Sequence, residues 1–295
     1  MKRIKISSLL AFFLAAGIYG ASAAQFSSSL ETLSALAPSA FDPARFPLAY
    51  VTVADYPADL SGEQLFQYLH TVTVPKAPPP EGHDYLDAKK FMFASADNTG
   101  CGGVPGVVAF YSQICVKGAS GHGEDYKEKG DQNGDGVVDS GGMNAEHMWP
   151  QAYFNKAYPM KSDLHHIQPT FLTPNGRRGS MPFTTVVKAQ YSTSSGSKLG
   201  PDGFEPCDPV KGDAARALLY FVVRYYDRNI RDGMNYKNFW TDKLPMLLEW
   251  NRRDPPDANE KRRNDLIAQF QGNRNPFVDD PALADRIGTR VFAAH

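Results

Sequence analysis

The most informative stretch of the chain reads Asn144-Ala145-Glu146-His147-Met148-Trp149-Pro150, then Lys161-Ser162-Asp163-Leu164-His165-His166-Ile167-Gln168-Pro169-Thr170, and then Asn175-Gly176-Arg177-Arg178-Gly179. Three of the seven histidines of the chain fall here, together with carboxylates, amides and two arginines. Such a concentration of polar and titratable side chains in a short window indicates a functional site.

The local pattern predicts a strand, a second strand and a short helix. Neighbouring residues of a regular strand point to opposite faces, so Glu146 and His147 can share a site only if the strand ends there. The dipeptide Trp149-Pro150 favours such an end, because proline disfavours continued strand pairing. We expect the second strand over residues 163–167 and the helix over 170–178, with Asn175 facing back towards His147. The two strands and the helix would together bind a cation.

These residue types suit the hydrolysis of a phosphodiester. That reaction needs a group to accept a proton from water, a hard cation and a positive group to hold the phosphate. Histidine suits the first task because its ordinary pKa is near neutrality. Glu146 and Asn175 offer the oxygen ligands that Mg²⁺ prefers, and Arg177 or Arg178 can grip phosphate oxygens.

The strings Asn-x-Glu-His-x-Trp-Pro-Gln, Ser-Asp-Leu-His-His-x-x-Pro-Thr and Asn-Gly-Arg-Arg-Gly closely resemble the endonuclease I family of extracellular and periplasmic nucleases, which belongs to the His-Me finger, or ββα-metal, class. The likeness continues through Glu205 to Ala217 and through Gln271 to Phe277, and it covers most of the chain beyond about Pro47. It implies a ββα-metal core at about residues 143–183, set in an α+β fold of mixed helices around a small sheet.

By this resemblance, His147 matches the general base of the family and is a catalytic residue. Glu146 matches the carboxylate that binds the catalytic Mg²⁺, and Asn175 matches the amide that completes the protein ligands. The resemblance also implies a sequence-nonspecific endonuclease whose products carry a 5′ phosphate and a 3′ hydroxyl.

The other polar residues of the stretch are expected to support the site. His166 stands nine residues before Asn175, where relatives often have asparagine, and we expect it to support the site rather than bind the metal. His165 and Asp163 also match family positions and are expected to hold the fold.

The sequence leaves open which residue binds the phosphate. Arg178 matches an arginine of the family motif, and it would act on the phosphate or form a structural salt bridge. Some relatives draw this arginine from a long insertion that is absent here. Arg177 and Lys161 are therefore further candidates for phosphate binding.

The sequence contains residues for two other conceivable metal sites. A zinc site of His147, His165 and His166 is disfavoured, because neighbouring histidines would point apart in a strand. A Ca²⁺ loop of the EF-hand type fits residues 131–139, although Gly142 stands where the closing glutamate is expected, and a solvated acidic turn is the alternative. The ligands of that loop would be Asp131, Asn133, Asp135, Val137 and Asp139.

The net charge of -1 gives the chain no general attraction for a polyanion. DNA or RNA would have to be bound through its backbone by local basic residues, without reading sequence. Residues 261–263, with Arg274, Arg177 and Arg178, are candidates for such a groove, and a solvated helix face is the alternative.

The N-terminal residues predict export. Lys2, Arg3 and Lys5 precede an apolar run over residues 9–18 and small residues at 21–23, so residues 1–23 are expected to form a signal peptide. Residues 24–46 would be a lead-in and 47–295 the nuclease domain. We expect a secreted or periplasmic protein without a membrane segment after cleavage.

The remaining patterns predict a largely helical scaffold. Helices are expected over residues 61–71, 213–225, 243–251 and 257–270, with a Ser/Gly-rich linker over 191–203. Of the three cysteines, Cys101 and Cys115 are close enough in sequence to close a loop, although any of three pairs is possible.

Two competing functions remain open. One is a calcium-binding secreted surface protein on an inactive nuclease scaffold. The other is a metal-dependent phosphodiesterase that acts on small nucleotides. The joint presence of Glu146, His147 and Asn175 favours catalysis over the first, and a long polymeric substrate separates the second.

Overall fold

A computed structural model of the chain describes residues 56–74, 85–118 and 142–295, all within the predicted domain. The predicted signal peptide, the lead-in and the candidate Ca²⁺ loop at 131–139 lie outside the described residues.

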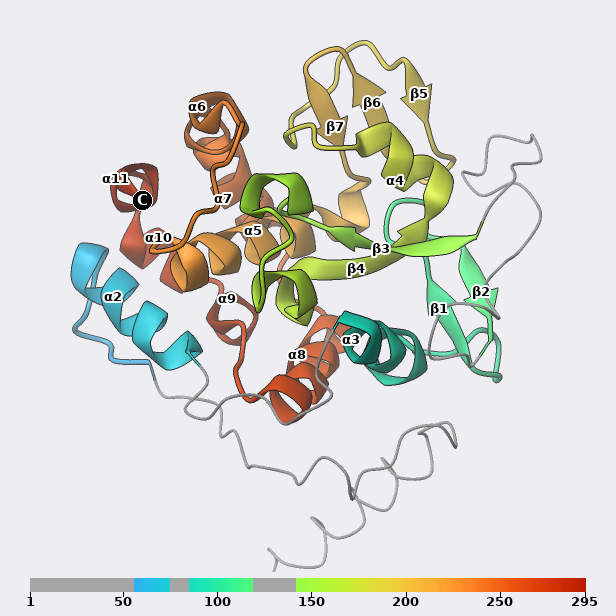
Figure 1. The fold of residues 1–295 in the computed structure, drawn as a ribbon, viewed down its shortest axis with the longest axis horizontal. Helices are drawn as coiled ribbons and strands as arrows, with labels where there is room; N and C mark the ends of the chain where they lie inside the picture. Colours follow the sequence, from blue (N-terminus) through green and yellow to red (C-terminus); the bar gives the residue numbers. More distant parts are fainter. Residues whose placement is uncertain (1–55, 75–84, 119–141) are drawn as a thin grey trace, which may run out of the picture. The chain divides into compact units, whose positions relative to one another are not determined.

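The described residues have an α+β fold, in which helices surround small antiparallel sheets (Figure 1), and the predicted fold class is confirmed. The order of the elements is α2 (Gly62–Thr73), α3 (Tyr85–Phe91), the π-helix η2 (Met92–Ala96), β1 (Gly106–Val108), β2 (Cys115–Lys117), β3 (Met143–His147), η3 (Gln151–Phe154), η4 (Met160–Ser162), η5 (Leu164–His166), β4 (Ile167–Phe171), α4 (Leu172–Arg178), β5 (Tyr191–Ser192), β6 (Lys198–Gly200), β7 (Gly203–Glu205), η6 (Asp208–Val210), α5 (Lys211–Tyr225), α6 (Tyr236–Phe239), η7 (Thr241–Lys243), α7 (Leu244–Arg253), α8 (Ala258–Gln271), α9 (Pro276–Asp279), α10 (Leu283–Ile287) and α11 (Thr289–Ala294).

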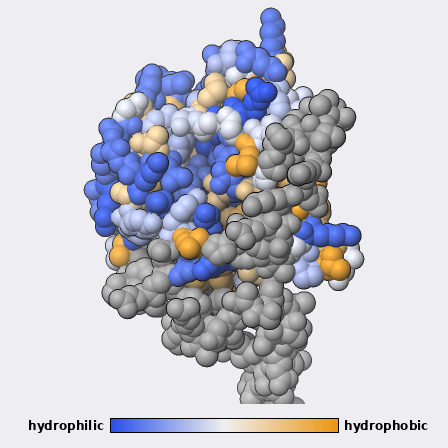
Figure 2. Space-filling model, turned by 45° about the vertical axis from the view of Figure 1, so that its right-hand side comes forward, coloured by the Kyte–Doolittle hydropathy of each residue, from blue (hydrophilic) through white to orange (hydrophobic). Residues whose placement is uncertain are grey.

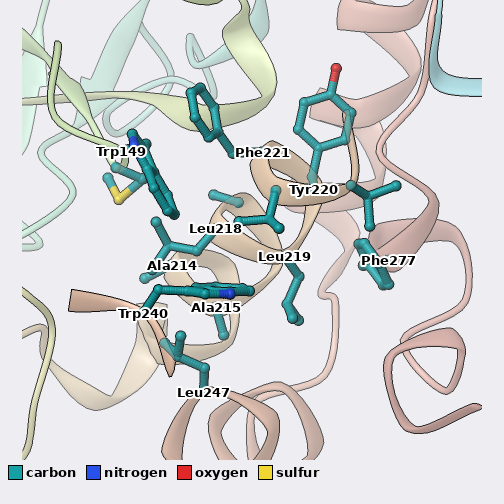
Figure 3. Close-up of a cluster of buried hydrophobic side chains, with 14 of the residues drawn as sticks. Trp149, Ala214, Ala215, Leu218, Leu219, Tyr220, Phe221, Trp240, Leu247 and Phe277 are labelled. Carbon is teal, nitrogen blue, oxygen red and sulfur yellow. The ribbon is translucent and has the colours of Figure 1, made fainter. Parts of the chain in front are cut away.

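Helix α5 lies at the centre of the larger hydrophobic core. Every residue from Ala214 to Tyr225 is buried, and among them only Arg216 and Arg224 are charged. Trp149, which follows β3, packs among the side chains of α5 (Figure 3), and its ring stacks on Phe221 with the centroids 5.1 Å apart. Met148 and Trp149 are both fully buried.

Strands β3 and β4 form an antiparallel pair, followed at once by α4. The register sets Met143 opposite Phe171 and His147 opposite Ile167. Strand β3 ends at His147, as the Trp149-Pro150 dipeptide predicts. Ala145 of β3 belongs to a second buried cluster, which also contains residues of η2 and α8.

The predicted second strand was placed too early in the sequence. Residues 164–166 form the 3-10 helix η5, and β4 begins at Ile167. Asp163 caps η5 by accepting a hydrogen bond from the His165 amide at 3.0 Å, and this turns the backbone away from an extended course. Pro169 sits inside β4 opposite Ala145, at a position where proline usually argues against a strand. The helix predicted over 170–178 is confirmed as α4.

The predicted linker over 191–203 is wrong, because it carries β5, β6 and the start of β7. The hydroxyls of Thr193, Ser195 and Ser197 all donate to the main-chain oxygen of Tyr111, at 3.1, 2.9 and 2.7 Å. Small polar residues that suggested a flexible linker therefore fasten this sheet to the segment after β1.

The hairpin of β1 and β2 is joined by a disulfide between Cys101 and Cys115, the pair that the spacing favoured, while Cys207 is free and buried. A Cβ on Gly106 would lie 2.4 Å from the Cys101 sulfur, so a side chain at this position would collide with the disulfide.

The longer helices follow the sequence pattern closely. Helix α8 begins after Asp257, whose side chain accepts from the Glu260 amide as the capping pattern predicts. Helix α5, expected from residue 213, begins two residues earlier at Lys211.

No helix in the described part of the chain is both long and apolar enough to cross a bilayer. The face shown in Figure 2 is mostly hydrophilic, with apolar side chains in separate small patches. Most large apolar side chains of the described residues instead lie in the two buried clusters.

Candidate active site

Glu146, near the end of β3, is held by one of its two oxygens. Its side chain is only 4% exposed, and Oε1 accepts hydrogen bonds from the Tyr111 hydroxyl at 2.7 Å and from Nη1 of Arg178 at 2.8 Å. Oε2 receives no hydrogen bond from the residues that the structure describes. Burial raises the pKa of Glu146, although Arg178 and the Tyr111 hydroxyl oppose this. The carboxylate is thus fixed through one oxygen, and the other lacks a protein donor.

His147, the next residue, has a defined tautomer. Its Nε2 lies 2.9 Å from the main-chain oxygen of Lys161. Because a carbonyl oxygen can only accept, the proton must be on Nε2, and Nδ1 carries a lone pair. Among the described residues Nδ1 is buried and has no hydrogen-bond partner. Burial lowers the pKa of His147 to about 3, so the ring is neutral at neutral pH.

Aromatic rings surround this imidazole. The ring centroids of Tyr85 and His166 lie 5.5 and 5.3 Å from that of His147, and Phe154 lies 6.3 Å away. Tyr85 is the first residue of α3, and its raised pKa, about 12, results from burial and from the nearby Tyr158 and Glu146. Tyr85 therefore contacts the ring of His147, and its pKa is affected by the charge of Glu146.

Arg178, at the end of α4, makes only internal contacts in the described part of the chain. Its Nη1 donates to Glu146 and to the main-chain oxygen of His147 at 3.0 Å. Nη2 donates to the oxygen of Met148 at 2.8 Å, and Nε donates to that of Met181 at 3.1 Å. The side chain is 0% exposed, so the guanidinium is buried and its hydrogen bonds hold the end of β3 in place.

The other candidate site residues, Asn175, Arg177 and Lys161, have freer side chains than Arg178. Asn175 is half-buried in α4, which contacts both β3 and β4, and within the described residues its side chain makes no hydrogen bond. Arg177 is exposed and lies over the ring of Tyr191, with 5.4 Å to the centroid. Lys161 is half-buried beside Tyr85.

Asp163 is the centre of a buried hydrogen-bond network behind His147. Its Oδ2 accepts from the hydroxyls of Tyr220 and Tyr225, each at 2.7 Å, and its Oδ1 accepts from Gln271 Nε2 at 2.7 Å and from the His165 amide. Burial alone would raise the pKa of Asp163, but nearby histidines and these hydrogen bonds lower it. The network ties η5 to α5 and α8.

His165 and His166 each bond through Nε2 to a main-chain oxygen. His165 reaches Asn273 at 2.8 Å, and His166 reaches Met160 at 2.7 Å. Burial lowers the pKa of each ring to about 4. His147 has the same arrangement, so in all three histidines Nε2 is occupied by a carbonyl, which argues against the zinc alternative. In the described residues no three His, Cys, Asp or Glu side chains are grouped around a position for a metal ion.

The basic groove predicted from the sequence is wrong for three of its six members, Arg178, Arg263 and Arg274. Arg263 is buried against Asp97 and donates to the main-chain oxygens of Leu164 and Ile167. Arg274 pairs with Asp279 and is 9% exposed. These arginines, like Arg178, hold the fold together and do not line a surface.

Some residues around the site were missed at first. Tyr111 and Tyr85 had no local signal, because each reaches the Glu146-His147 pair only through the fold. Gln271 and Asn273 belong to a motif that had no assigned role, and both reach the Asp163 network. Asn273 Nδ2 donates to the Tyr220 hydroxyl at 2.6 Å.

Comparison with known proteins gives a consistent group of relatives. The sequence model of the family described as Endonuclease I matches residues 84–282. The chain is 39% identical over 167 residues to the extracellular ribonuclease of Bacillus amyloliquefaciens, covering 53% of this chain and 56% of that protein. It is 29% identical over 136 residues to the periplasmic deoxyribonuclease of Aeromonas hydrophila, covering 43% of this chain and 50% of that protein.

A second extracellular ribonuclease, from Bacillus subtilis strain 168, is 37% identical over 158 residues, covering 50% of this chain and 54% of that protein. The chain thus spans about half the length of the curated relatives it matches.

Proposed function

Because this chain belongs to the endonuclease I family, with more than half of its residues matched, we propose that it is a secreted or periplasmic endonuclease that hydrolyses phosphodiesters of DNA or RNA. The names of its relatives, extracellular ribonuclease and periplasmic deoxyribonuclease, support both the reaction and the location. The observation that carries the proposal is that the buried Nδ1 of His147, beside Glu146, has no hydrogen-bond partner among the described residues.

His147 acts as the general base in this proposal. The Lys161 carbonyl keeps the proton on Nε2, so Nδ1 can accept a proton from the attacking water. The low pKa of His147, about 3, keeps the ring in the neutral form that can act as a base. The water oxygen then attacks phosphorus, the bond from phosphorus to the 3′ oxygen breaks, and that oxygen takes up a proton. The expected products are therefore a 5′ phosphate and a 3′ hydroxyl.

Glu146 and Asn175 fit the role of ligands for a divalent cation, with Mg²⁺ as the expected ion. Glu146 offers Oε2, which has no protein donor among the described residues, and Asn175 offers an amide without a hydrogen bond there. Few protein ligands suit Mg²⁺, which retains several waters. When bound, the cation would neutralise negative charge that builds up on the phosphate. We propose that β3, β4 and α4 form a ββα-metal motif of the His-Me finger class.

Arg178 is a positioning residue in this account rather than a catalytic one. Its guanidinium fixes Glu146 and the backbone of His147, and its burial keeps it from a substrate. Phosphate binding then falls to Lys161 beside His147, or to the exposed Arg177.

Digestion of two polymers tests this function. Purified chain is incubated with supercoiled plasmid and with total RNA, in Mg²⁺ and in EDTA. Metal-dependent degradation of either polymer supports an endonuclease. Cleavage of small nucleotide diesters alone would favour the phosphodiesterase reading, and no cleavage with any divalent ion would favour the inactive, calcium-binding scaffold.

A further inference from the structure

Two ammonium groups converge on one aromatic ring at the edge of the proposed active site. Nζ of Lys89 lies 4.8 Å from the ring centroid of Tyr85, and Nζ of Lys161 lies 5.1 Å from it. Neither lysine forms an ion pair with a carboxylate in the part of the chain that the structure describes. Both ammonium groups thus lie close to the same ring, where their positive charges attract an anion.

The exposed ring of Tyr158 lies beside Lys161. Nζ of Lys161 is 5.5 Å from its centroid, and the residue is 52% exposed. Tyr158 is one of few large apolar or aromatic side chains of the described residues that are so exposed. A flat, exposed ring beside positive charge is the usual platform for an unpaired nucleobase.

The fold places these lysines and Tyr158 next to His147, the proposed general base. The main-chain oxygen of Lys161 accepts the hydrogen bond from His147, so the lysine carries both the partner of the imidazole and an ammonium group. The ring of Tyr85 lies beside that of His147, with 5.5 Å between the centroids. Helix α3, which carries Tyr85 and Lys89, contacts η4, which carries Lys161 (Figure 1).

We propose that Lys89, Lys161 and Tyr158 form a subsite for one unpaired nucleotide next to the bond that is cut. The two ammonium groups bind its phosphate, and its base stacks on Tyr158. In a duplex both faces of a base are covered by its neighbours, so the stacking contact favours single-stranded DNA or RNA. This inference rests on the proposed function and names its preferred substrate class.

Binding measurements test the subsite apart from catalysis. A His147→Ala protein is titrated, in Mg²⁺, with a fluorescein-labelled single-stranded DNA, the same sequence as RNA, and the DNA duplex. Adding Tyr158→Ala should weaken binding of both single strands by about 5- to 150-fold, because one stacked base contributes about 1–3 kcal/mol. Tyr158→Phe should bind as the parent does, and the duplex should bind equally to all three.

Lysine variants provide the second arm. Lys89→Gln should weaken both single-stranded and duplex binding, since it removes a phosphate contact. The matched control is Lys237→Gln, whose side chain is 76% exposed and pairs with Asp242, and it should leave binding unchanged. Circular dichroism verifies that each variant is folded.

The outcomes separate the two proposals. If the wild-type chain cleaves nucleic acid but Tyr158→Ala binds single strands as tightly as its parent, the subsite is refuted and the nuclease stands. An equal loss of single-stranded and duplex binding would also refute base stacking. If the wild-type chain neither binds nor cleaves any polymer, the proposed function itself fails.

Discussion

Nη1 of Arg178 lies 2.8 Å from Oε1 of Glu146, and neither side chain is more than 4% exposed. Arg178→Met would leave this carboxylate buried without its ionic partner. Loss of one partner of a buried pair costs about 3–5 kcal/mol, so the free energy of unfolding in urea should fall by that amount. Arg177→Met, the exposed neighbour, should change it by less than about 0.5 kcal/mol. Equal unfolding midpoints for the two variants would contradict the role of Arg178.

Glu146→Gln should weaken Mg²⁺ binding at least about tenfold, because the amide keeps the shape of the side chain but removes its negative charge. Isothermal titration of chelator-treated protein measures this directly. Glu249→Gln, a change at an exposed carboxylate on α7, is the control and should bind Mg²⁺ as the wild type does. An unchanged affinity in Glu146→Gln would remove Glu146 from the metal site.

Tyr225→Phe should destabilise the fold by about 1–3 kcal/mol, since it deletes a donor to the buried carboxylate of Asp163. The adjacent Tyr226→Phe is a matched control, because that hydroxyl donates to Gln67 in a partly exposed position. Thermal and urea unfolding of both variants provide the comparison. Our description of the Asp163 network would be wrong if Tyr226→Phe were the more damaging change.

His165 should make the fold less stable in acid. Burial lowers its pKa from 6.5 to about 4, so the unfolded chain takes up a proton more readily than the folded one. The stability associated with the neutral ring is full above pH 6.5 and is lost as the pH falls towards 4. At pH 5 the loss is about 2 kcal/mol.

Comparison with His165→Gln isolates this histidine, because the other buried histidines titrate in both proteins. The stability of the wild type relative to the variant should decrease by about 2 kcal/mol between pH 7.5 and pH 5, measured by urea unfolding. A difference that stays constant with pH would show that His165 does not titrate in this range.

The sequence predicted the elements whose signals are local. The end of β3 follows from Trp149-Pro150, α4 from its position after the second strand, and the start of α8 from the Asp257 and Glu260 pair. The residue types around Glu146 and His147 were sufficient to propose the chemistry, although not to show which atoms are free.

The errors arise where tertiary contacts override a local pattern. Pro169 is tolerated in β4, where its carbonyl accepts from the Phe110 amide at 2.8 Å. Thr193, Ser195 and Ser197 are ordered because their hydroxyls all donate to the main-chain oxygen of Tyr111, which is distant in sequence. The sequence left both phosphate binding and another role open for Arg178 and Arg263, because burial cannot be read from a residue type. Lys89 and Tyr158 carry no local sequence signal, because only the fold places Lys89 against Tyr85 and Tyr158 against Lys161.

The most direct test of the account is the single-turnover rate at which the chain cleaves a labelled single-stranded oligonucleotide in Mg²⁺, before and after His147→Ala. The account predicts a loss of at least about 10³-fold, within the range for removal of a general base, with an unchanged circular dichroism spectrum. The control variant His295→Gln, at the Glu63 contact, should cleave at the wild-type rate. Cleavage by His147→Ala at the wild-type rate would contradict the assignment of His147 as the base.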